Sequence, residues 1–312
     1  MATLGANART ILIAGPTASG KSGLAVALAE RLDGVVINAD SMQVYRELAI
    51  LTARPSPADQ QRAPHALYGF VTGAEAYSAG RYAVDVAQAI AAARTLGRVP
   101  IVVGGTGLYF KVVLEGLSPV PAADPQVRAF WRAQATARPA PELHALLAAR
   151  DPETAARLMP TDPQRIVRAL EVLESTGRSL SHWQRAPGTP VLQENETVRL
   201  LVLPERDGHG ASIDVRFDAM MKDGALDEVR ALAALGYSTE LPIMRALGVA
   251  PFTAHLDGQC SLEEAVAAGK VHTRQFAKRQ RTWLKRNMMS WNAIGAQQTE
   301  RILDIALSFI DH

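Results

Sequence analysis

The chain has 312 residues, of which 48% are hydrophobic and 21% are charged, and its formal net charge at pH 7 is +2. This composition is typical of a water-soluble protein with one large domain or two smaller ones. No apolar run approaches the ~20 residues that cross a bilayer, and the first residues lack the apolar segment of a signal peptide. A single cysteine, Cys260, excludes an internal disulfide and a cysteine-based zinc site. We therefore expect a cytoplasmic protein without a membrane segment.

Short apolar runs alternate with helical patterns over the first 117 residues. Residues 10–14, 35–38 and 100–103 are typical of buried strands, whereas 22–32 and 82–97 place apolar residues at helical spacing. Strands that alternate with helices indicate a parallel sheet covered by helices. The sequence therefore predicts an α/β core that begins with residues 1–117.

A change of composition at residue 118 marks a second part of the chain. From there to about residue 181 the sequence is rich in Ala, Leu and Arg, and three helical segments begin with prolines at 141, 152 and 163. Asp151 and Asp162 precede two of these prolines, so we expect them to cap the helices. Residues 197–203 return to the pattern of a buried strand. We expect a helical insertion domain over 118–196 and a core that is completed by 197–312.

The chain after residue 205 has a helical pattern throughout, and Ser261 and Glu264 have the spacing of a capping box that opens a long final helix. Seven basic residues and no acidic residue lie between 265 and 299, which leaves a net charge of −5 for the rest of the chain. Four of the basic residues are expected to share one helix face, namely Arg274, Lys278, Arg281 and Lys285. Faces that serve only solubility usually mix both signs of charge. The segment therefore predicts contact with a polyanion, and its aromatic residues suit RNA.

The octapeptide "GPTASGKS" (Gly15–Ser22) has the G-x-x-x-x-G-K-S pattern of a phosphate-binding loop. It follows a predicted strand and precedes a predicted helix, which is the context that this pattern requires. Backbone N–H groups would surround phosphate oxygens, Lys21 would add a positive charge, and Ser22 could bind Mg²⁺. The motif predicts a phosphate ligand without saying whether that ligand is ATP.

Two further features are expected at the same edge of the sheet. The run "VVINAD" places Asp40 just after a strand, where it could organise a metal ion or act as a general base. The run "VVGGTGLYF" forms a second glycine-rich turn, in which Gly104, Gly105 and Gly107 would allow a ligand to approach and Thr106 supplies a hydroxyl. We expect the two glycine turns to lie side by side.

Five motifs together resemble the tRNA dimethylallyltransferase (tRNA isopentenyltransferase) family, in that family's order and over nearly the whole chain. They are "GPTASGKS", "ADSMQVYR", "PIVVGGTGLYF", "DPQRIVRALEV" and "TRQFAKRQRTWLK". The resemblance implies a P-loop NTPase/kinase-like parallel sheet core, a helical insertion that grips the anticodon arm of tRNA, and a helical C-terminal part. It also implies transfer of the dimethylallyl group from dimethylallyl diphosphate to N6 of the adenosine 3′ to the anticodon, with Mg²⁺ assisting departure of the diphosphate.

The resemblance assigns roles to single residues. Asp40 would be the base, Thr106 would bind the oxygen that bridges diphosphate and prenyl carbon, and Lys21 would neutralise charge. The residues implied to bind the diphosphate are Gly15, Thr17, Ala18, Ser19, Gly20, Lys21, Ser22 and Arg216, with Ser22 also at the metal ion. The residues implied to contact tRNA are Asp40, Ser41, Met42, Gln43, Thr106, Arg128, Gln164, Arg165, Ile166, Val167, Arg168, Arg245, Lys278, Arg279, Gln280, Arg281, Thr282, Trp283 and Lys285. We expect the enzyme to act as a monomer.

The chain also departs from the family pattern. Glu47 and Leu51 stand where glycines are usual, Ala66 where a second histidine is usual, Ser212 where an arginine is often found, and Val249 where a tyrosine is common. Two other functions remain open at this point. One is an ATP-dependent kinase that acts on a small molecule or nucleoside, and the other is an RNA-binding ATPase.

Overall fold

The computed structural model describes residues 9–295 and 301–310, which divide into two compact units. The first unit combines residues up to Leu114 with those from Val191 onward, and the second unit is Glu115–Pro190. The boundaries predicted from composition, 118 and 196, lie three and six residues further along the chain. Each unit is described by itself below.

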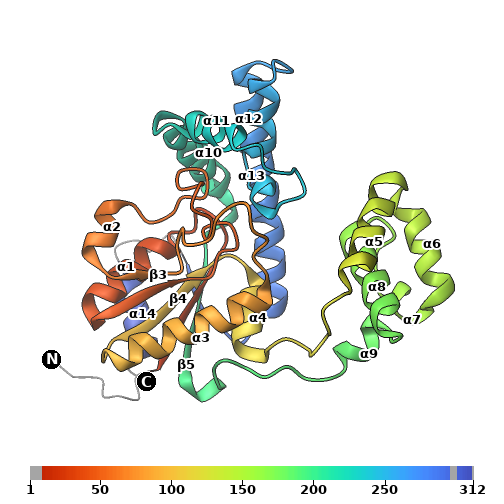
Figure 1. The fold of residues 1–312 in the computed structure, drawn as a ribbon. Helices are drawn as coiled ribbons and strands as arrows, with labels where there is room; N and C mark the ends of the chain where they lie inside the picture. The colour runs from red at the N-terminus through yellow and green to blue at the C-terminus, as the bar shows by residue number, and fades with distance from the viewer. Residues whose placement is uncertain (1–8, 296–300, 311–312) are drawn as a thin grey trace. The chain divides into compact units, whose positions relative to one another are not determined.

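A six-stranded parallel sheet forms the centre of the first unit, with strand order β3-β2-β4-β1-β5-β6 (Figure 1). The predicted fold class is confirmed. The strands on which the prediction rested lie within one residue of their expected bounds, because fully buried strands are continuous apolar runs. The strands are β1 (Thr10–Ala14), β2 (Gly34–Asn38), β3 (His65–Ala66), β4 (Val99–Gly104), β5 (Thr197–Leu203) and β6 (Asn292–Gly295).

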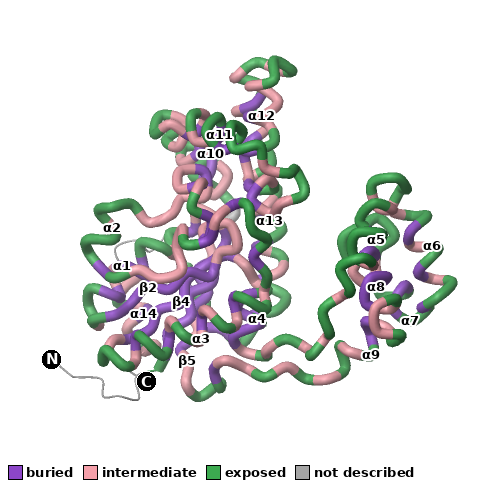
Figure 2. The backbone as a smooth tube through the Cα atoms, in the orientation of Figure 1, coloured by how far each residue is buried: buried purple, intermediate pink, exposed green. Residues whose placement is uncertain are grey.

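Helices cover both faces of this sheet. One face packs against α1 (Lys21–Leu32) and α14 (Ile302–Ile310), and α2 (Pro57–Arg62) lies against α1. The other packs against α3 (Ala79–Thr95) and α4 (Gly107–Glu115), and its core continues into the C-terminal helices. Figure 2 shows the sheet as the most continuously buried part of this unit. The C-terminal elements are α10 (Arg206–Lys222), α11 (Ala225–Ala234), η2 (Pro242–Arg245), α12 (Val249–Leu256) and α13 (Leu262–Asn287).

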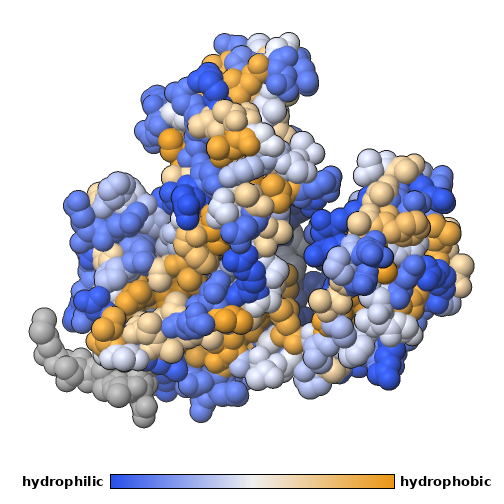
Figure 3. All heavy atoms as spheres, in the orientation of Figure 1, coloured by the Kyte–Doolittle hydropathy of each residue, from blue (hydrophilic) through white to orange (hydrophobic). Residues whose placement is uncertain are grey.

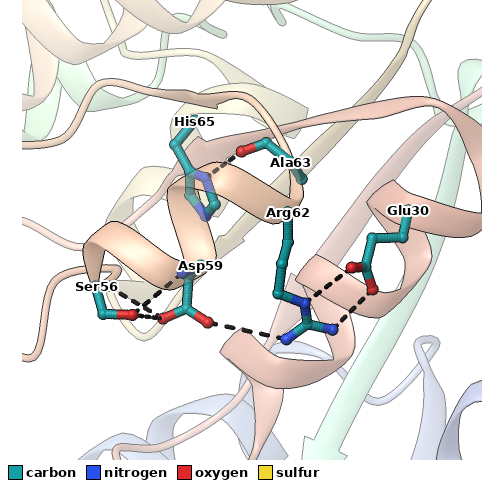
Figure 4. Close-up of polar contacts among 6 residues, drawn as sticks. All are labelled: Glu30, Ser56, Asp59, Arg62, Ala63 and His65. Carbon is teal, nitrogen blue, oxygen red and sulfur yellow. Dashed lines mark hydrogen bonds and ion pairs between the residues drawn. The ribbon is translucent and has the colours of Figure 1, made fainter.

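The helix α2 precedes the edge strand β3 in the chain and is linked to α1 by side-chain hydrogen bonds (Figure 4). Ser56 and Asp59 form a capping box at its start. Arg62 at its end makes two hydrogen bonds, of 2.8 and 2.7 Å, to the carboxylate of Glu30 on α1. The next residues form β3, in which Ala66 pairs with Ile37 of β2. Ala66, which departs from the family pattern, therefore lies in a strand that is only two residues long.

Two expectations about secondary structure are wrong. The chain after residue 205 is not wholly helical, because β6 pairs with β5 beyond the long helix. With only four residues, Asn292–Gly295 is too short to show a strand pattern in the sequence. The helix predicted to run from Pro163 to Leu180 ends at Thr176, since Gly177 adopts a left-handed conformation (φ 68°) that terminates it.

The second unit is helical throughout and has its own core. Trp131, Leu143, Ile166 and Leu170 are buried together in it. Asp151 and Asp162 accept hydrogen bonds from backbone N–H groups at the starts of α7 and α8, so the predicted caps are confirmed. The elements here are α5 (Pro125–Ala137), α6 (Ala140–Arg150), α7 (Pro152–Ala155), α8 (Pro163–Thr176) and α9 (Leu180–Gln184). The short 3-10 helix η1 (Glu194–Glu196) then leads into β5.

The register of the sheet predicts that Gly104→Ala is severely destabilising. A Cβ at Gly104 would lie 2.0 Å from the carbonyl oxygen of Ala39, which is backbone that cannot rotate away. We expect a loss of about 3 kcal/mol or more in the free energy of unfolding, measured by urea denaturation. The matched control is Gly23→Ala, because Gly23 lies in α1 with open space around it and should gain up to ~1 kcal/mol. Equal stabilities for the two variants would contradict this account of the sheet edge.

Candidate active site

The phosphate loop connects β1 to α1 at the carboxyl edge of the sheet. Ala18 and Gly20 adopt left-handed conformations (φ 56° and 82°), which turn the chain sharply before the helix begins at Lys21. No side chain caps the first turn of α1, so its N–H groups remain available to an anion. Gly15 is required by packing, because a Cβ there would lie 2.7 Å from the carbonyl oxygen of Val202 on β5.

Asp40 follows β2 at the same edge, and hydrogen bonds to both its backbone and its side chain hold it in place. The amide of Asn38 bridges the peptide of Asp40, donating to its carbonyl oxygen (2.9 Å) and accepting from its N–H (2.8 Å). The carboxylate Oδ1 of Asp40 accepts the N–H of Met42 (2.9 Å). Asn38 is fully buried. The sequence analysis gave it no role, although a polar residue that ends an apolar run was the available signal.

Thr106 lies beside Asp40, as the two motifs predicted. Its hydroxyl accepts the N–H of Ser41 (3.0 Å) and donates to the Ser41 hydroxyl (3.3 Å), while its N–H donates to the carbonyl oxygen of Ala39 (3.2 Å). The strands β1, β4 and β2 are neighbours, and the N–H of Gly15 donates to the carbonyl oxygen of Gly104 (3.3 Å). The two glycine turns therefore lie side by side.

The glycines of the second turn admit protein rather than a ligand. A Cβ at Gly105 would lie 2.2 Å from the side-chain nitrogen of Gln280, and one at Gly107 would lie 2.1 Å from the ring of Trp283. Both partners belong to α13, which packs directly on the turn. The expectation that these glycines make room for a ligand is wrong.

Two cations lie near the carboxylate of Asp40. Burial and the positive charge of Arg216 together lower the pKa of Lys21 to about 8, although the negative charge of Asp40 acts in the opposite direction. Burial also lowers the pKa of Arg216, and Asp40 again acts in the opposite direction. Lys21 donates from Nζ to the carbonyl oxygen of Pro16 (3.1 Å). The structure thus brings Lys21, Arg216 and Asp40 together, from α1, α10 and the end of β2.

Two tyrosines complete the surroundings of Asp40. Burial raises the pKa values of Tyr68 and Tyr109, and the charge of Asp40 raises both further. Both phenols therefore remain protonated at neutral pH. The sequence analysis assigned no role to either residue, although Tyr109 lies within the motif "VVGGTGLYF".

The basic helix α13 has a different arrangement from the one expected. Arg274 forms an ion pair with Asp214 (2.5 Å) and Lys270 with Asp218 (2.6 Å), both acids lying on α10. Arg281 is half-buried and donates to the carbonyl oxygen of Pro204 (2.5 Å). Four residues implied to contact tRNA remain exposed on this helix, namely Lys278, Arg279, Thr282 and Lys285, and Trp283 is half-buried. The predicted four-residue basic face is therefore reduced to Lys278 and Lys285.

Other residues implied to contact tRNA have varied exposure. In the second unit, Arg128, Gln164 and Arg165 are exposed, and Arg168 pairs with Glu171 (3.6 Å). Ile166 and Val167 are buried in the core of that unit. In the first unit, Arg245 is exposed and Ser41 is half-buried. Met42 packs against the core on the α3 and α4 side of the sheet. The side-chain nitrogen of Gln43 donates to the carbonyl oxygens of Thr52 and Ala53.

Some of the exposed apolar residues of the first unit lie on α3 and α4. Figure 3 shows hydrophobic residues gathered over the region where Figure 1 draws α3 and α4. Val84 and Leu108 are 56% and 49% exposed there.

The sequence model of the IPP transferase family matches residues 43–287, and that of isopentenyl transferases matches residues 8–66. The chain belongs to the IPP transferase family. Relatives named tRNA dimethylallyltransferase include one from Parvibaculum lavamentivorans, 50% identical over 97% of this chain and 96% of the relative, and one from Azorhizobium caulinodans, 53% identical over 90% of each. The family predicted from the five motifs is confirmed, and prenyl transfer is favoured over a kinase activity.

Solved structures of the family agree with the fold. The tRNA isopentenylpyrophosphate transferase of Bacillus halodurans is 31% identical, with a TM-score of 0.69 over 97% of both chains. A eukaryotic dimethylallyltransferase, described as acting on tRNA, is 27% identical, with a TM-score of 0.78 over 93% of this chain and 74% of that one. Within residues 9–295 and 301–310 no helix is long and apolar enough to span a membrane.

The charges around Lys21 predict opposite effects for two substitutions. Arg216→Met removes a positive neighbour and should raise the pKa of Lys21 above about 8, whereas Asp40→Asn removes a negative neighbour and should lower it. Titration of the Lys21 side-chain signals by NMR measures both shifts. Shifts in the same direction, or no shift in either variant, would show that the three groups do not interact.

Proposed function

We propose that this IPP transferase family member transfers a dimethylallyl group from dimethylallyl diphosphate to N6 of the adenosine 3′ to the anticodon of tRNA. The observation that carries this proposal is the position of Asp40. The N–H of the next residue, Ser41, donates to the hydroxyl of Thr106, and the charges of Lys21 and Arg216 lie near the Asp40 carboxylate. A carboxylate that accepts a proton and a cationic phosphate loop that receives a leaving diphosphate are the two groups that prenyl transfer to an amine requires.

The donor diphosphate would lie on the phosphate loop. The uncapped N–H groups at the start of α1 and the charges of Lys21 and Arg216 would hold its oxygens. As the bond between the prenyl carbon and the bridging oxygen breaks, negative charge grows on the diphosphate, and these fixed groups stabilise it. Thr106 can donate to the bridging oxygen once its hydroxyl proton turns away from the Ser41 hydroxyl.

A Mg²⁺ ion fits this site only together with the diphosphate. The described residues hold no cluster of three His, Cys, Asp or Glu side chains that could bind a metal alone. Mg²⁺ commonly takes one or two protein ligands and completes its shell with substrate phosphates and water. Ser22, exposed at the first turn of α1, would be the protein ligand. The ion would supply charge neutralisation for the departing diphosphate.

Asp40 would take the proton from the adenine amine. Its Oδ1 already accepts the N–H of Met42, so the remaining oxygen, Oδ2, is the one we assign as the base. As the new bond forms between N6 and the prenyl carbon, the amine proton becomes acidic and passes to Oδ2. The protonated phenols of Tyr68 and Tyr109 do not compete for this proton.

The tRNA would be held by exposed basic residues and by the insertion. Lys278 and Lys285 on α13 can bind backbone phosphates, and so can Arg128 and Arg165 in the second unit. An adenine must leave its stack before its amine can reach Asp40. We propose that the enzyme acts as a monomer in the cytoplasm.

A transfer assay tests the proposal directly. The protein is incubated with Mg²⁺, tRNA and either dimethylallyl diphosphate or ATP, and the tRNA nucleosides are analysed by mass spectrometry. We expect N6-(dimethylallyl)adenosine from the prenyl donor without ATP. Consumption of ATP without a modified tRNA would instead support the kinase or ATPase alternatives.

Asp40→Asn should lower turnover by about 10²- to 10⁴-fold, as loss of a general base does. The variant keeps an oxygen that can accept the N–H of Met42, so tRNA affinity should stay close to that of the unaltered enzyme. Asp33→Asn is the control, since Asp33 lies exposed at the opposite end of β2. Loss of tRNA binding in Asp40→Asn would contradict the role of base.

Neutralising Lys278 and Lys285 together with Gln should weaken tRNA binding and reduce the dependence of log K on log salt by about 1 to 2. Filter binding at several salt concentrations measures both quantities. Lys222→Gln removes an exposed charge from α10 and should change neither. An unchanged salt dependence in the double variant would assign the exposed side of α13 to another role.

A further inference from the structure

The peptide of Thr17, at the start of the phosphate loop, is held from two sides. Its N–H donates to Oε1 of Gln280 on α13 (2.9 Å), and its carbonyl oxygen lies 2.9 Å from Nε2 of His209 on α10. Because a carbonyl oxygen only accepts, Nε2 of His209 must carry the proton. Side chains that lie 192 and 263 residues further along the chain thus meet at one peptide of the loop.

Gln280 also holds the second glycine turn. Its side-chain nitrogen donates to the carbonyl oxygen of Gly105 (3.0 Å), so both ends of one buried amide are used, one on each turn. Only 7% of Gln280 is exposed. Gly105 leaves just enough space for this contact, since a Cβ there would lie 2.2 Å from the amide nitrogen. A buried amide with both of its groups satisfied specifies one arrangement of its partners.

The loop needs such support because its next residue is strained. Ala18 adopts a left-handed conformation (φ 56°), which costs free energy for any residue other than glycine. A strained peptide persists only where its surroundings hold it in place. The bonds to Thr17 immediately before Ala18 provide that restraint, in addition to the bond from Lys21 to Pro16.

We propose that Gln280 and His209 are positioning residues, which fix the Thr17 peptide and so hold the phosphate loop in register with the turn that carries Thr106. This inference rests on the proposed function and deepens it. The N–H of Thr17 is then committed to Gln280, and the diphosphate is bound by the later N–H groups of the loop. The helix α13 would then contribute to binding of both substrates. Gln280 positions the loop that binds the donor, and the exposed Lys278 and Lys285 bind the RNA.

The first test replaces Gln280 with Met, which has similar length and forms neither hydrogen bond. We expect the Kd for inorganic diphosphate, measured by calorimetry with Mg²⁺, and the KM for dimethylallyl diphosphate to rise about tenfold, the effect of one buried hydrogen bond. The Kd for tRNA should change less than twofold. Gln275→Met is the matched control, because Gln275 is exposed on the same helix.

A second pair of variants tests His209 independently of α13. In His209→Gln, the side-chain nitrogen can occupy the position of Nε2 and still donate to Thr17, so donor affinity should be retained. His209→Leu cannot donate and should raise the Kd for diphosphate. Thermal melting shows whether Gln280→Met folds. If it does not, the two His209 variants still test the proposal.

Hydrogen exchange at the N–H of Thr17 provides a measurement that does not depend on catalysis. We expect faster exchange of this N–H in Gln280→Met than in Gln275→Met. The proposal is overturned if folded Gln280→Met and His209→Leu both bind diphosphate as tightly as the unaltered protein, or if tRNA affinity falls instead of donor affinity. Absence of prenyl transfer by the unaltered protein would refute the proposed function, while the exchange measurement would still test the restraint on Thr17.

Discussion

The close approach of three backbone segments at the carboxyl edge of the sheet determines the rest of the site. The N–H of Thr106 donates to the carbonyl oxygen of Ala39, and the N–H of Gly15 donates to that of Gly104. A Cβ at Gly104 would occupy the space of the Ala39 backbone. The separation between the phosphate loop and Asp40 is therefore set by main-chain packing. Rotation of side chains alone cannot change it, which suits a reaction that needs a base and a leaving-group site at a fixed distance.

Much of this arrangement could be predicted from the sequence, because its signals are local. Buried parallel strands are continuous apolar runs, and the phosphate loop is a contiguous motif, so β1, β5 and Gly15–Ser22 were located within a residue. The residue that packs against a glycine, by contrast, can lie far away in the sequence. A glycine that admits a ligand and one that admits Gln280 or Trp283 look the same in the sequence, and the second turn was interpreted wrongly for that reason.

The prediction of a basic face on α13 failed for the same reason, because it used only nearby residues. Counting charges along residues 265–299 gave a uniformly basic segment, since the acids that neutralise it, Asp214 and Asp218, belong to another helix. Arg274 and Arg281 are seven residues apart and both turn toward elements of the core, whereas Lys278 and Lys285 turn outward. Helical periodicity correctly groups residues seven apart. It does not reveal which groups face protein and which face solvent.

An internal carboxylate already binds the N–H groups of the loop after Asp40. The carboxylate of Glu228 accepts the N–H groups of Ala49, Ile50 and Leu51 at 2.5, 2.8 and 2.9 Å, so an internal anion already satisfies this cluster of N–H donors.

Glu47, where the family usually has glycine, extends this anchoring. Burial acts to raise its pKa, but hydrogen bonds from the N–H of Gly73 and from other donors, including the hydroxyl of Tyr237, lower it overall, so Glu47 stays ionised. The side chain of Glu47 thus fastens the loop to Gly73 and to Tyr237. The first turn of α1, by contrast, has no side chain to cap it. The N–H groups at the start of α1 therefore differ from those of residues 49–51, to which an internal carboxylate is already bound.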